Sequence, residues 1–311
     1  MHLYWRSVMI DQIILVAEKI DSSLNLSIDS FDFEKTDTKY FNQVMGSLEN
    51  IAEKVIHIED ISDLYQYKDS NSIVISLWSG ESTKFRKALV PSICESLNIK
   101  YLGADPYSSI ICQDKNLSKL FARKYGIKSS NGFIVNNIQG LECIPSIQFP
   151  VVVKPNFEGG SIGINENSLA PDIDSMKNRV QTLLSTGHTS VLVEEFLPGI
   201  EVSIIVCGNK DGISFLDASE IYIKEDPGFL LNNIYSAEKK KIKSEGLTTA
   251  HRLATSDLSQ STLLAAEQLF KGLQKCEILR IDGKLNNGEF KLIELTPDIH
   301  LGESATFHRT F

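Results

Sequence analysis

The chain has 311 residues, of which 42% are hydrophobic and 23% are charged, so it is long enough for two or three domains with apolar cores. Its formal net charge of -9 argues against a nucleic-acid partner, because binding to a phosphate backbone relies on clustered lysine and arginine. The sequence contains no run near the roughly 20 apolar residues of a membrane helix and no recognisable secretory signal, so we expect no membrane partner and a cytoplasmic location.

The five cysteines are scattered without a C-x-x-C pair, and the six histidines are dispersed. This pattern is typical of reduced thiols and indicates neither a zinc site nor a Cys/His nucleophile pair. Any chemistry is therefore expected from other residue types.

The first hundred residues alternate short apolar runs with segments of helical or mixed periodicity, which predicts an open α/β sheet. The apolar runs are "QIILVAEKI" (12–20), "KVIHIED" (54–60) and "SIVISLW" (72–78). Residues 82–99 then have helical periodicity and lead into "KYLGADP", a short strand with turn residues.

A second unit begins with a helix predicted at 114–127. Its apolar residues recur at the spacing of one helix face, and Gly126 follows as a stop signal. These apolar residues are Leu117, Leu120, Phe121 and Tyr125. A strand at 132–135, a strand beginning at Phe149 and a helix at 172–187 complete a small mixed domain.

The stretch "FPVVVKPNFEGGSIGI" (149–164) carries the first chemical signal. Its opening residues are typical of a buried strand, because β-branched side chains suit a covered, pleated surface. Lys154 at the strand end is costly to bury unless an anion meets it, and the following glycines let backbone N–H groups approach a phosphate. The hypothesis of a phosphate site names Gly159, Gly160 and Ser161 together with Lys154; a solvated strand edge followed by a glycine turn is the alternative.

A third unit begins at residue 190, where alternating residues and the Asp211–Gly212 turn indicate antiparallel hairpins. Its segment "VLVEEFLPGIEVSIIV" displays carboxylates around an apolar edge. Adenine fits an apolar slot with acceptor groups at the rim, and a carboxylate holds a ribose diol well. The residues concerned are Glu194, Phe196, Leu197 and Glu201, for which exposed acidic positions on a strand are the alternative.

In "ILRIDGKLNNGEFKLIELTPD", two strand-like runs flank a predicted three-residue hairpin loop at 286–288. That loop places Arg280 opposite Glu294, with Asp282 and Thr296 on the same face. Two acids and an arginine on adjacent strands can form a site for a divalent metal and an oxyanion. A structural ion pair between Arg280 and Glu294 is the alternative.

The segments "DKNLSK", "FPVVVKPNFEGGSIG", "VLVEEFLPGIE", "RID" and "LIELTP", in this order, resemble the ATP-grasp ligases, and within them the D-alanine–D-alanine ligases and their relatives. The similarity runs from about residue 73 to the end of the chain. It implies an N-terminal α/β domain with an open sheet (1–104) and two ATP-grasp subdomains that clamp ATP. These are a central lid (105–190) and a C-terminal subdomain with the metal and catalytic site (191–311).

For the nucleotide, the resemblance implies two phosphate-binding lysines, a phosphate-contacting serine, a carboxylate at the adenine amino group, two residues lining the base and a carboxylate on the ribose. In that order these are Lys115 and Lys154, Ser161, Glu194, Phe196 and Leu197, and Glu201.

At the catalytic end, the resemblance implies two magnesium ligands, an arginine that stabilises the tetrahedral intermediate and a residue that holds the carboxylate of the second substrate. In that order these are Asp282 and Glu294, Arg280, and Ser304. The segment "NNIYSAEKKK" resembles the mobile loop that closes over the γ-phosphate, with Lys239 or Lys240 as its lysine.

Some positions depart from the family pattern. Thr296 stands where the family usually has an asparagine as third metal contact. The family's D-alanine enzymes hold the first amino acid with an N-terminal glutamate, a loop serine and a loop tyrosine. Here Gly160 replaces the serine, Lys240 stands near the place of the tyrosine, and the sequence has no matching glutamate in an N-terminal glycine-rich segment.

With its departures, the resemblance therefore implies an ATP- and Mg²⁺-dependent carboxylate–amine ligase for amino acids or similar small molecules, acting through an acylphosphate and not selective for D-alanine. A true D-alanine–D-alanine ligase is one alternative. A nucleotide-binding protein that has lost catalysis, motivated by Thr296, is the other. A homodimer is the expected assembly, although the sequence does not decide the oligomeric state.

Overall fold

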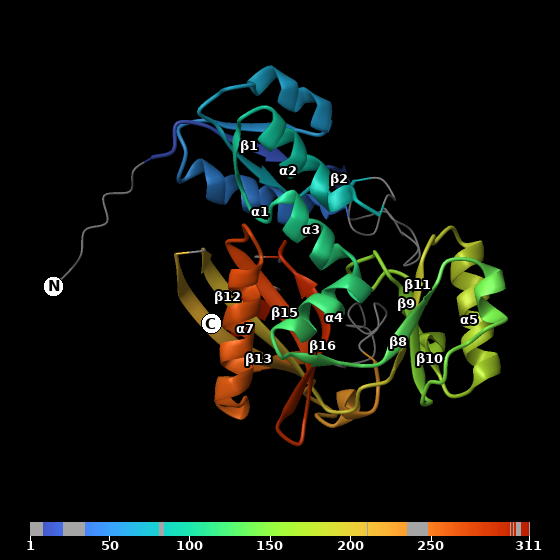
Figure 1. The fold of residues 1–311 in the computed structure, drawn as a ribbon. Coiled ribbons are helices and arrows are strands. Elements are labelled where there is room, and N and C mark those ends of the chain that lie inside the picture. Colours follow the sequence, from blue (N-terminus) through green and yellow to red (C-terminus); the bar gives the residue numbers. More distant parts are fainter. Residues whose placement is uncertain are drawn as a thin grey trace.

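The structure is a computed structural model that describes residues 9–20, 35–80, 84–209, 211–234, 248–298, 300, 302 and 306–310. Within these ranges the chain forms a mixed α/β fold with three larger sheets and helices packed on them (Figure 1). No helix in these ranges combines the length and the apolar character needed to cross a bilayer.

The N-terminal part contains a parallel sheet with the strand order β4-β1-β5-β6. Its strands are β1 (Ile13–Val16), β4 (Val55–Ile58), β5 (Ile73–Ser76) and β6 (Lys100–Leu102). Each residue of β1 is buried, as expected for an inner strand of a sheet with both faces covered. The prediction of an open α/β sheet in the first hundred residues is confirmed.

Helices cover the two faces of this sheet. Helix α1 (Thr38–Glu49) contributes Phe41 and Leu48 to one apolar core, and α2 (Arg86–Ser96) contributes Val90 and Cys94 to the other. The remaining elements of this part are β2 (Lys19–Ile20), which pairs with β3 (Thr36–Asp37), and the 3-10 helix η2 (Ile61–Tyr67).

The central part is an antiparallel sheet with the order β10-β9-β11-β8. Its strands are β8 (Gly132–Val135), β9 (Val151–Pro155), β10 (Leu169–Ala170) and β11 (Val191–Glu195), and the 3-10 helices η3 (Ile138–Leu141) and η4 (Glu166–Ser168) lie in its connections. Helix α5 (Ile173–Ser185) covers this sheet, with Met176, Val180 and Leu183 in the shared core (Figure 1). The predicted strand with a lysine near its end is therefore β9.

The C-terminal part is a six-stranded sheet with the order β14-β13-β12-β15-β16-β7. Its strands are β7 (Lys128–Ser129), β12 (Ile200–Asn209), β13 (Gly212–Ile223), β14 (Thr249–Leu253), β15 (Ile278–Asn286) and β16 (Glu289–Thr296). The helices α3 (Pro106–Gln113), α4 (Lys115–Lys124) and α7 (Gln260–Gly272) share its apolar core. The short elements η5 (Phe229–Leu231), η6 (Thr255–Asp257) and α8 (Thr306–Thr310) complete this part.

Residues of the six-stranded sheet alternate between the two faces. Val202, Ile204 and Ile281 point into the core beneath the helices. The residues between them, such as Ser203 and Asp282, therefore point to the opposite face. This face carries the candidate site.

One predicted helix face differs in the structure. Leu120 of α4 is 55% exposed, whereas Lys115, Ser118 and Lys119 are buried. The apolar spacing therefore predicted the position of Leu120 wrongly. The buried lysines are tolerated because both sheets supply oxygen partners to them, as described below.

The predicted hairpin register is also wrong. The loop is a two-residue turn at Asn287–Gly288, with φ of 50° and 78°, and Asn286 pairs with Glu289. A bulge between Asp282 and Gly283 then shifts the pairing again, so that Asp282 lies opposite Glu294 and Arg280 lies opposite Thr296.

The division into domains at 1–104, 105–190 and 191–311 stays a prediction. In the structure β11 belongs to the central sheet as far as Glu195, and α3 and α4 pack on the six-stranded sheet.

Candidate functional site

A buried ion cluster lies where α4 meets the central sheet. We call Lys115, Lys119, Lys154 and Glu194 the lysine wall. Lys154 Nζ is 2.6 Å from Glu194 Oε1, and Lys119 Nζ is 2.9 Å from Glu194 Oε2. The Ser130 hydroxyl donates a further hydrogen bond of 2.6 Å to Glu194 Oε2. The Glu194 carboxylate thus accepts hydrogen bonds from side chains of β9, of α4 and of the segment before β8.

The charges of the lysine wall are coupled. Burial alone would raise the pKa of Glu194, but Lys119, Lys154 and the hydrogen bonds to the carboxylate lower this pKa to about 2. Burial lowers the pKa of Lys119 to about 8; Glu194 opposes this shift, while Lys154 adds to it. The anion that meets Lys154 inside the protein is therefore a charged glutamate, and the three lysines leave an excess of positive charge.

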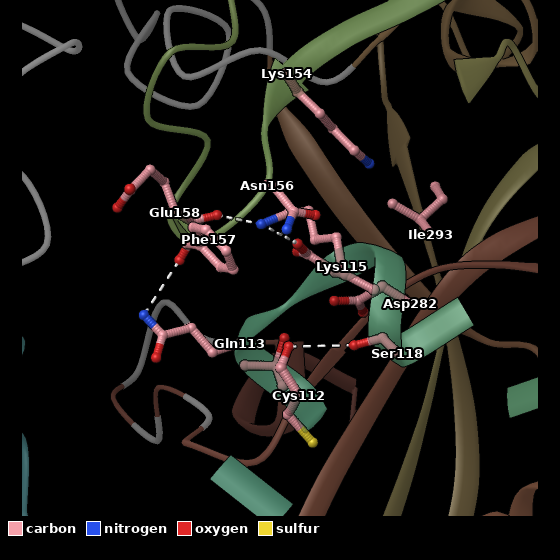
Figure 2. A network of polar contacts seen from close by, with 12 residues as sticks. Cys112, Gln113, Lys115, Ser118, Lys154, Asn156, Phe157, Glu158, Asp282 and Ile293 are labelled. Carbon is pink, nitrogen blue, oxygen red and sulfur yellow. Dashed lines mark hydrogen bonds and ion pairs between the residues drawn. The ribbon is translucent and has the colours of Figure 1, made fainter. Parts of the chain in front are cut away.

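The start of α4 is tied to the segment that follows β9. Asn156 accepts from the backbone N–H of Lys115 at 3.2 Å and, through Oδ1, from that of Asn116 at 3.1 Å. Its side-chain amide donates to Asp114 Oδ1 at 2.9 Å, and the Lys115 ammonium donates to the Glu158 carbonyl oxygen. Figure 2 shows Asn156 and Glu158 beside Lys115, with Lys154 extending from its strand above them. These hydrogen bonds hold Lys115 beside the loop that follows Lys154, so the two predicted phosphate-binding lysines lie at the same loop.

The glycine loop has a defined backbone. Gly160, Ser161 and Gly163 have φ of 60°, 66° and 66°. At Gly163 a Cβ atom would lie 2.6 Å from the Pro155 ring, so this position requires glycine for space as well as conformation. Arg179 of α5 donates to the Gly163 carbonyl oxygen at 2.6 Å. The central sheet and its helix therefore hold the loop in place.

A cavity lies between the lysine wall and the six-stranded sheet. Seven of the nine predicted nucleotide residues line it, namely Lys115, Lys154, Ser161, Glu194, Phe196, Leu197 and Glu201, and Glu294 joins them. Val152, Ile164 and Ile293 add apolar surface. An apolar slot with a few charged groups at its edge suits a nucleotide, since the base needs the slot and the phosphates need the lysines.

At the sheet end of the site lies a second group, which we call the carboxylate floor: Arg280, Asp282, Glu294 and Thr296. Arg280 Nε donates to both oxygens of Asp282, at 2.8 and 2.9 Å, and Arg280 Nη2 lies 2.8 Å from Asp282 Oδ2. Ser203 donates to Asp282 Oδ1 at 2.6 Å, and Arg280 Nη2 donates to the Thr296 hydroxyl at 3.5 Å. Burial would lower the pKa of Arg280, but Asp282 raises it above its usual value.

The carboxylate floor can supply two ligands to a hard cation. Asp282 and Glu294 are direct cross-strand neighbours, and Glu294 Oε2 is 3.6 Å from Lys115 Nζ. The described part of the chain has no cluster of three or more histidine, cysteine, aspartate or glutamate residues able to hold a metal. Mg²⁺ commonly takes only one or two carboxylates and completes its shell with phosphate oxygens and water. The pair therefore fits Mg²⁺ that is bound together with a nucleotide.

Three predicted residues, Lys239, Lys240 and Ser304, lie outside the described residues. Gly159 and Gly160 belong to the glycine loop but do not line the cavity. Seven predicted nucleotide residues and Glu294 line the cavity, whereas Arg280, Asp282 and Thr296 lie next to Glu294 on the same sheet outside its lining.

Sequence reasoning missed at least five polar residues of the site: Glu158 and Glu195, which line the cavity, and Lys119, Ser203 and Lys284. Lys119 follows the first phosphate lysine by four positions, the spacing of one helix face. Ser203 follows Glu201, and Lys284 follows Asp282, by the two positions that keep a strand residue on the same face. These spacings were the signal in the sequence that could have identified Lys119, Ser203 and Lys284. In the structure Lys119 and Ser203 contact predicted residues, and Lys284 lines the cavity.

Comparison with known proteins identifies the family of this chain. The family model "D-ala D-ala ligase C-terminus" matches residues 129–298. Among curated proteins, an uncharacterized protein of Sinorhizobium fredii is 27% identical over 221 residues, covering 70% of this chain and 62% of that protein. A D-alanine–D-alanine ligase of Halalkalibacterium halodurans is 29% identical over 212 residues, covering 63% and 62%. The chain thus matches less than two thirds of the length of either relative.

Solved structures share the fold. The Bacillus anthracis D-alanine–D-alanine ligase complexed with ATP has a TM-score of 0.66 and 20% identity, covering 95% of this chain and 88% of that one. The VanG D-Ala:D-Ser ligase of Enterococcus faecalis has a TM-score of 0.60 and 16% identity, covering 95% and 92%. The predicted α/β architecture of the ATP-grasp type is therefore confirmed.

Proposed function

This chain belongs to the ATP-grasp family of D-alanine–D-alanine ligases and their relatives, and from that membership we propose that it is an ATP-dependent carboxylate–amine ligase. It joins amino acids or similar small molecules by an amide bond. The observation that carries the proposal is a cavity whose lining combines an apolar slot, Lys115, Lys154 and Glu194 of the lysine wall and a glutamate of the carboxylate floor.

The lysine wall and the glycine loop are assigned to the phosphates. Lys115 and Lys154 supply positive charge, and the backbone N–H groups around Ser161 supply further donors in a fixed loop. Phe196 and Leu197 form the slot for the base, with Glu194 at its inner end and Glu201 at the ribose. This arrangement orients a nucleotide without a covalent bond to the protein, which is what phosphoryl transfer requires.

The charges of the site support a need for Mg²⁺. The cavity lining carries three lysines and five glutamates, namely Lys115, Lys154 and Lys284 against Glu158, Glu194, Glu195, Glu201 and Glu294. This lining has no excess of positive charge to balance a triphosphate, so a divalent cation on Asp282 and Glu294 completes the balance. When bound, Mg²⁺ neutralises charge on the transferring phosphoryl group.

The proposed reaction has two steps. An oxygen of the substrate carboxylate bonds to the γ-phosphorus as the bond to ADP breaks, giving an acylphosphate. The amine of the second substrate then bonds to the acyl carbon, and phosphate leaves. Arg280, oriented by Asp282, directs its guanidinium at the oxygen that gains charge in the second step. Roles for Lys239 or Lys240 at the γ-phosphate and for Ser304 at the second substrate belong to this proposal.

The test is ADP release with ATP and Mg²⁺ over a panel of D- and L-amino acids, offered singly and in pairs, with mass detection of products. We expect turnover that requires one carboxylate and one amine and that is lost in Glu294→Gln. Glu289→Gln, on the exposed end of the same strand, is the matched control and should keep activity.

The panel also separates the related activities. D-Alanyl-D-alanine as the main product would replace the proposal of a changed first substrate, which rests on Gly160 and Lys240. Binding of ATP without turnover on any pair would contradict ligase activity and favour a nucleotide-binding protein. A cytoplasmic location and a homodimer remain predictions.

A further inference from the structure

A buried lysine to which the proposed reaction assigns no role lines the nucleotide cavity on the side of the six-stranded sheet. Lys284 of β15 pairs across the sheet with Glu201 of β12, and both side chains line the cavity beside Phe196 and Leu197. Lys284 is only 4% exposed. Its ammonium donates to the Leu230 carbonyl oxygen at 2.7 Å and lies 3.3 Å from Glu201 Oε2.

The position of this ammonium is fixed from several sides. Leu230 belongs to η5, and the carbonyl of its neighbour Leu231 accepts from the Gly199 N–H at 3.0 Å, just before β12. A Cβ atom on Gly199 would lie 2.5 Å from the Leu285 carbonyl oxygen, so β15 and this turn are in close contact. Lys284 is therefore held in one place before any ligand arrives, which lowers the entropy lost on binding.

Hydrogen-bonding capacity is left over on both members of the pair. An ammonium has three donors, and among the described residues Lys284 has two oxygen partners. Glu201 meets Lys284 through Oε2, while its Oε1 has no partner within the described ranges. A buried donor without a partner is unfavourable, so a ligand or water oxygen is expected there.

The Lys284 ammonium is a donor and the Glu201 carboxylate is an acceptor, and they lie about one hydrogen-bond length apart. Together they suit a hydroxyl group, which both accepts and donates a hydrogen bond. A carboxylate can only accept from a hydroxyl, whereas an adjacent ammonium can donate to the lone pair of the same oxygen. A ribose diol presents two such hydroxyls. The apolar slot formed by Phe196 and Leu197 next to the pair would receive the base attached to that ribose.

We propose that Lys284 binds a ribose hydroxyl oxygen and, together with Glu201, selects ribonucleotides over deoxyribonucleotides. The proposal rests on the function proposed above and assigns to it a residue that contacts the sugar directly. A lysine that only added positive charge to the cavity would affect all nucleotides alike, whereas a lysine that touches a hydroxyl affects those carrying that hydroxyl.

The test uses isothermal titration calorimetry, in which ADP, 2′-deoxy-ADP or 3′-deoxy-ADP is titrated into the whole chain. The measured quantity is the ratio of the dissociation constant of each deoxy compound to that of ADP. The unmodified chain should prefer ADP over at least one deoxy compound by about tenfold or more, the size expected for a hydrogen bond to a charged group. Lys284→Met should lower that ratio about tenfold.

Two further variants support the measurement. Lys291→Met is the matched control, because Lys291 pairs with Lys284 across the sheet but is outside the cavity, and it should keep the full ratio. Lys284→Gln keeps an N–H donor and should retain part of the ratio. Thermal unfolding of each variant checks that it is folded.

An unchanged ratio in folded Lys284→Met, even with weaker binding overall, overturns the role of Lys284 and leaves the proposed function standing. Equal affinity of the unmodified chain for all three nucleotides overturns it without reference to any variant. Failure of the unmodified chain to bind ADP at all contradicts the proposed function, and the inference falls with it.

Discussion

The lysine wall and the carboxylate floor face the same nucleotide site but are built differently. In the wall, the side chains of Lys119, Lys154 and Glu194 are at most 7% exposed and are paired with one another. In the floor, the side chain of Glu294 is 29% exposed, and Asp282 is engaged by Arg280. The wall is held by pairs among buried side chains, whereas the side chains of the floor are more open to solvent.

The wall and the floor are therefore two kinds of charged site, which differ in how far their side chains are buried. Buried charges in the wall must stay paired, because an uncompensated charge in the interior is strongly unfavourable. Charges in the floor are partly solvated, so losing one alters chemistry more than stability. Wall substitutions should therefore act first on folding, and floor substitutions first on turnover.

The largest effect is expected from Glu194→Gln. It leaves Lys119 and Lys154 buried without their carboxylate, and we expect the free energy of unfolding to fall by about 3–5 kcal/mol. Urea denaturation measures this loss. Glu195→Gln is the control: Glu195 is only partly buried and accepts from Asn131 and the Gln148 N–H, so a loss of about 1 kcal/mol or less is expected. Equal losses in the two variants would show that the burial of Glu194 between the two lysines has no effect of its own.

Glu294→Gln should show the opposite pattern. Turnover should fall roughly 100-fold or more, because a magnesium ligand is lost, while the free energy of unfolding changes by about 1 kcal/mol or less. Steady-state kinetics and denaturation of the same preparation measure both quantities. A large loss of stability with normal turnover per folded molecule would mean that Glu294 is structural.

Gly163→Ala tests the loop that supports the wall. The substitution combines a positive φ with a Cβ atom 2.6 Å from the Pro155 ring, so a loss of about 1–3 kcal/mol and weaker ADP binding are expected. Gly288→Ala is the control, because Gly288 has a φ of 78° with nothing within 4 Å of the added atom. If both variants lose the same stability, the contact with Pro155 has no effect of its own.

The smallest effect is the pH dependence of Lys119, whose pKa is about 8. ADP affinity should be constant below this pH and fall as the pH rises through it, by at most about tenfold per unit, because the lysine wall loses a positive charge. Stability should move the other way. The unfolded chain, with a lysine pKa of about 10.4, keeps a proton that the folded chain has released, so this group stabilises the fold as the pH rises.

Titration calorimetry of ADP between about pH 7 and 9.5 measures this dependence. Lys119→Met should remove the decline near pH 8, while Lys128→Met, an exposed lysine paired with Glu289, should keep it. A decline that persists unchanged in Lys119→Met would assign the titration to another group.

The features that could be predicted from the sequence are those set by neighbouring residues. The buried strand, Lys154 and the glycines after it form one local signal, and the structure places them as one strand and loop. The burial of Lys119 could not be predicted, because its partners, Glu194 and the Ile293 carbonyl oxygen, belong to two different sheets. Helical spacing alone favoured Leu120 for the buried face.

The sequence by itself determined the order of the chemical segments, the membership in a family and the identity of most residues around the cavity. Tertiary structure decided which residues face each other. One bulge placed Asp282 opposite Glu294 and Arg280 opposite Thr296, and the pairing of β12 with β15 brought Lys284 to Glu201. The reason is physical: strand periodicity fixes the face of a residue, whereas its partner depends on register, which turns and bulges set through contacts between distant parts of the chain.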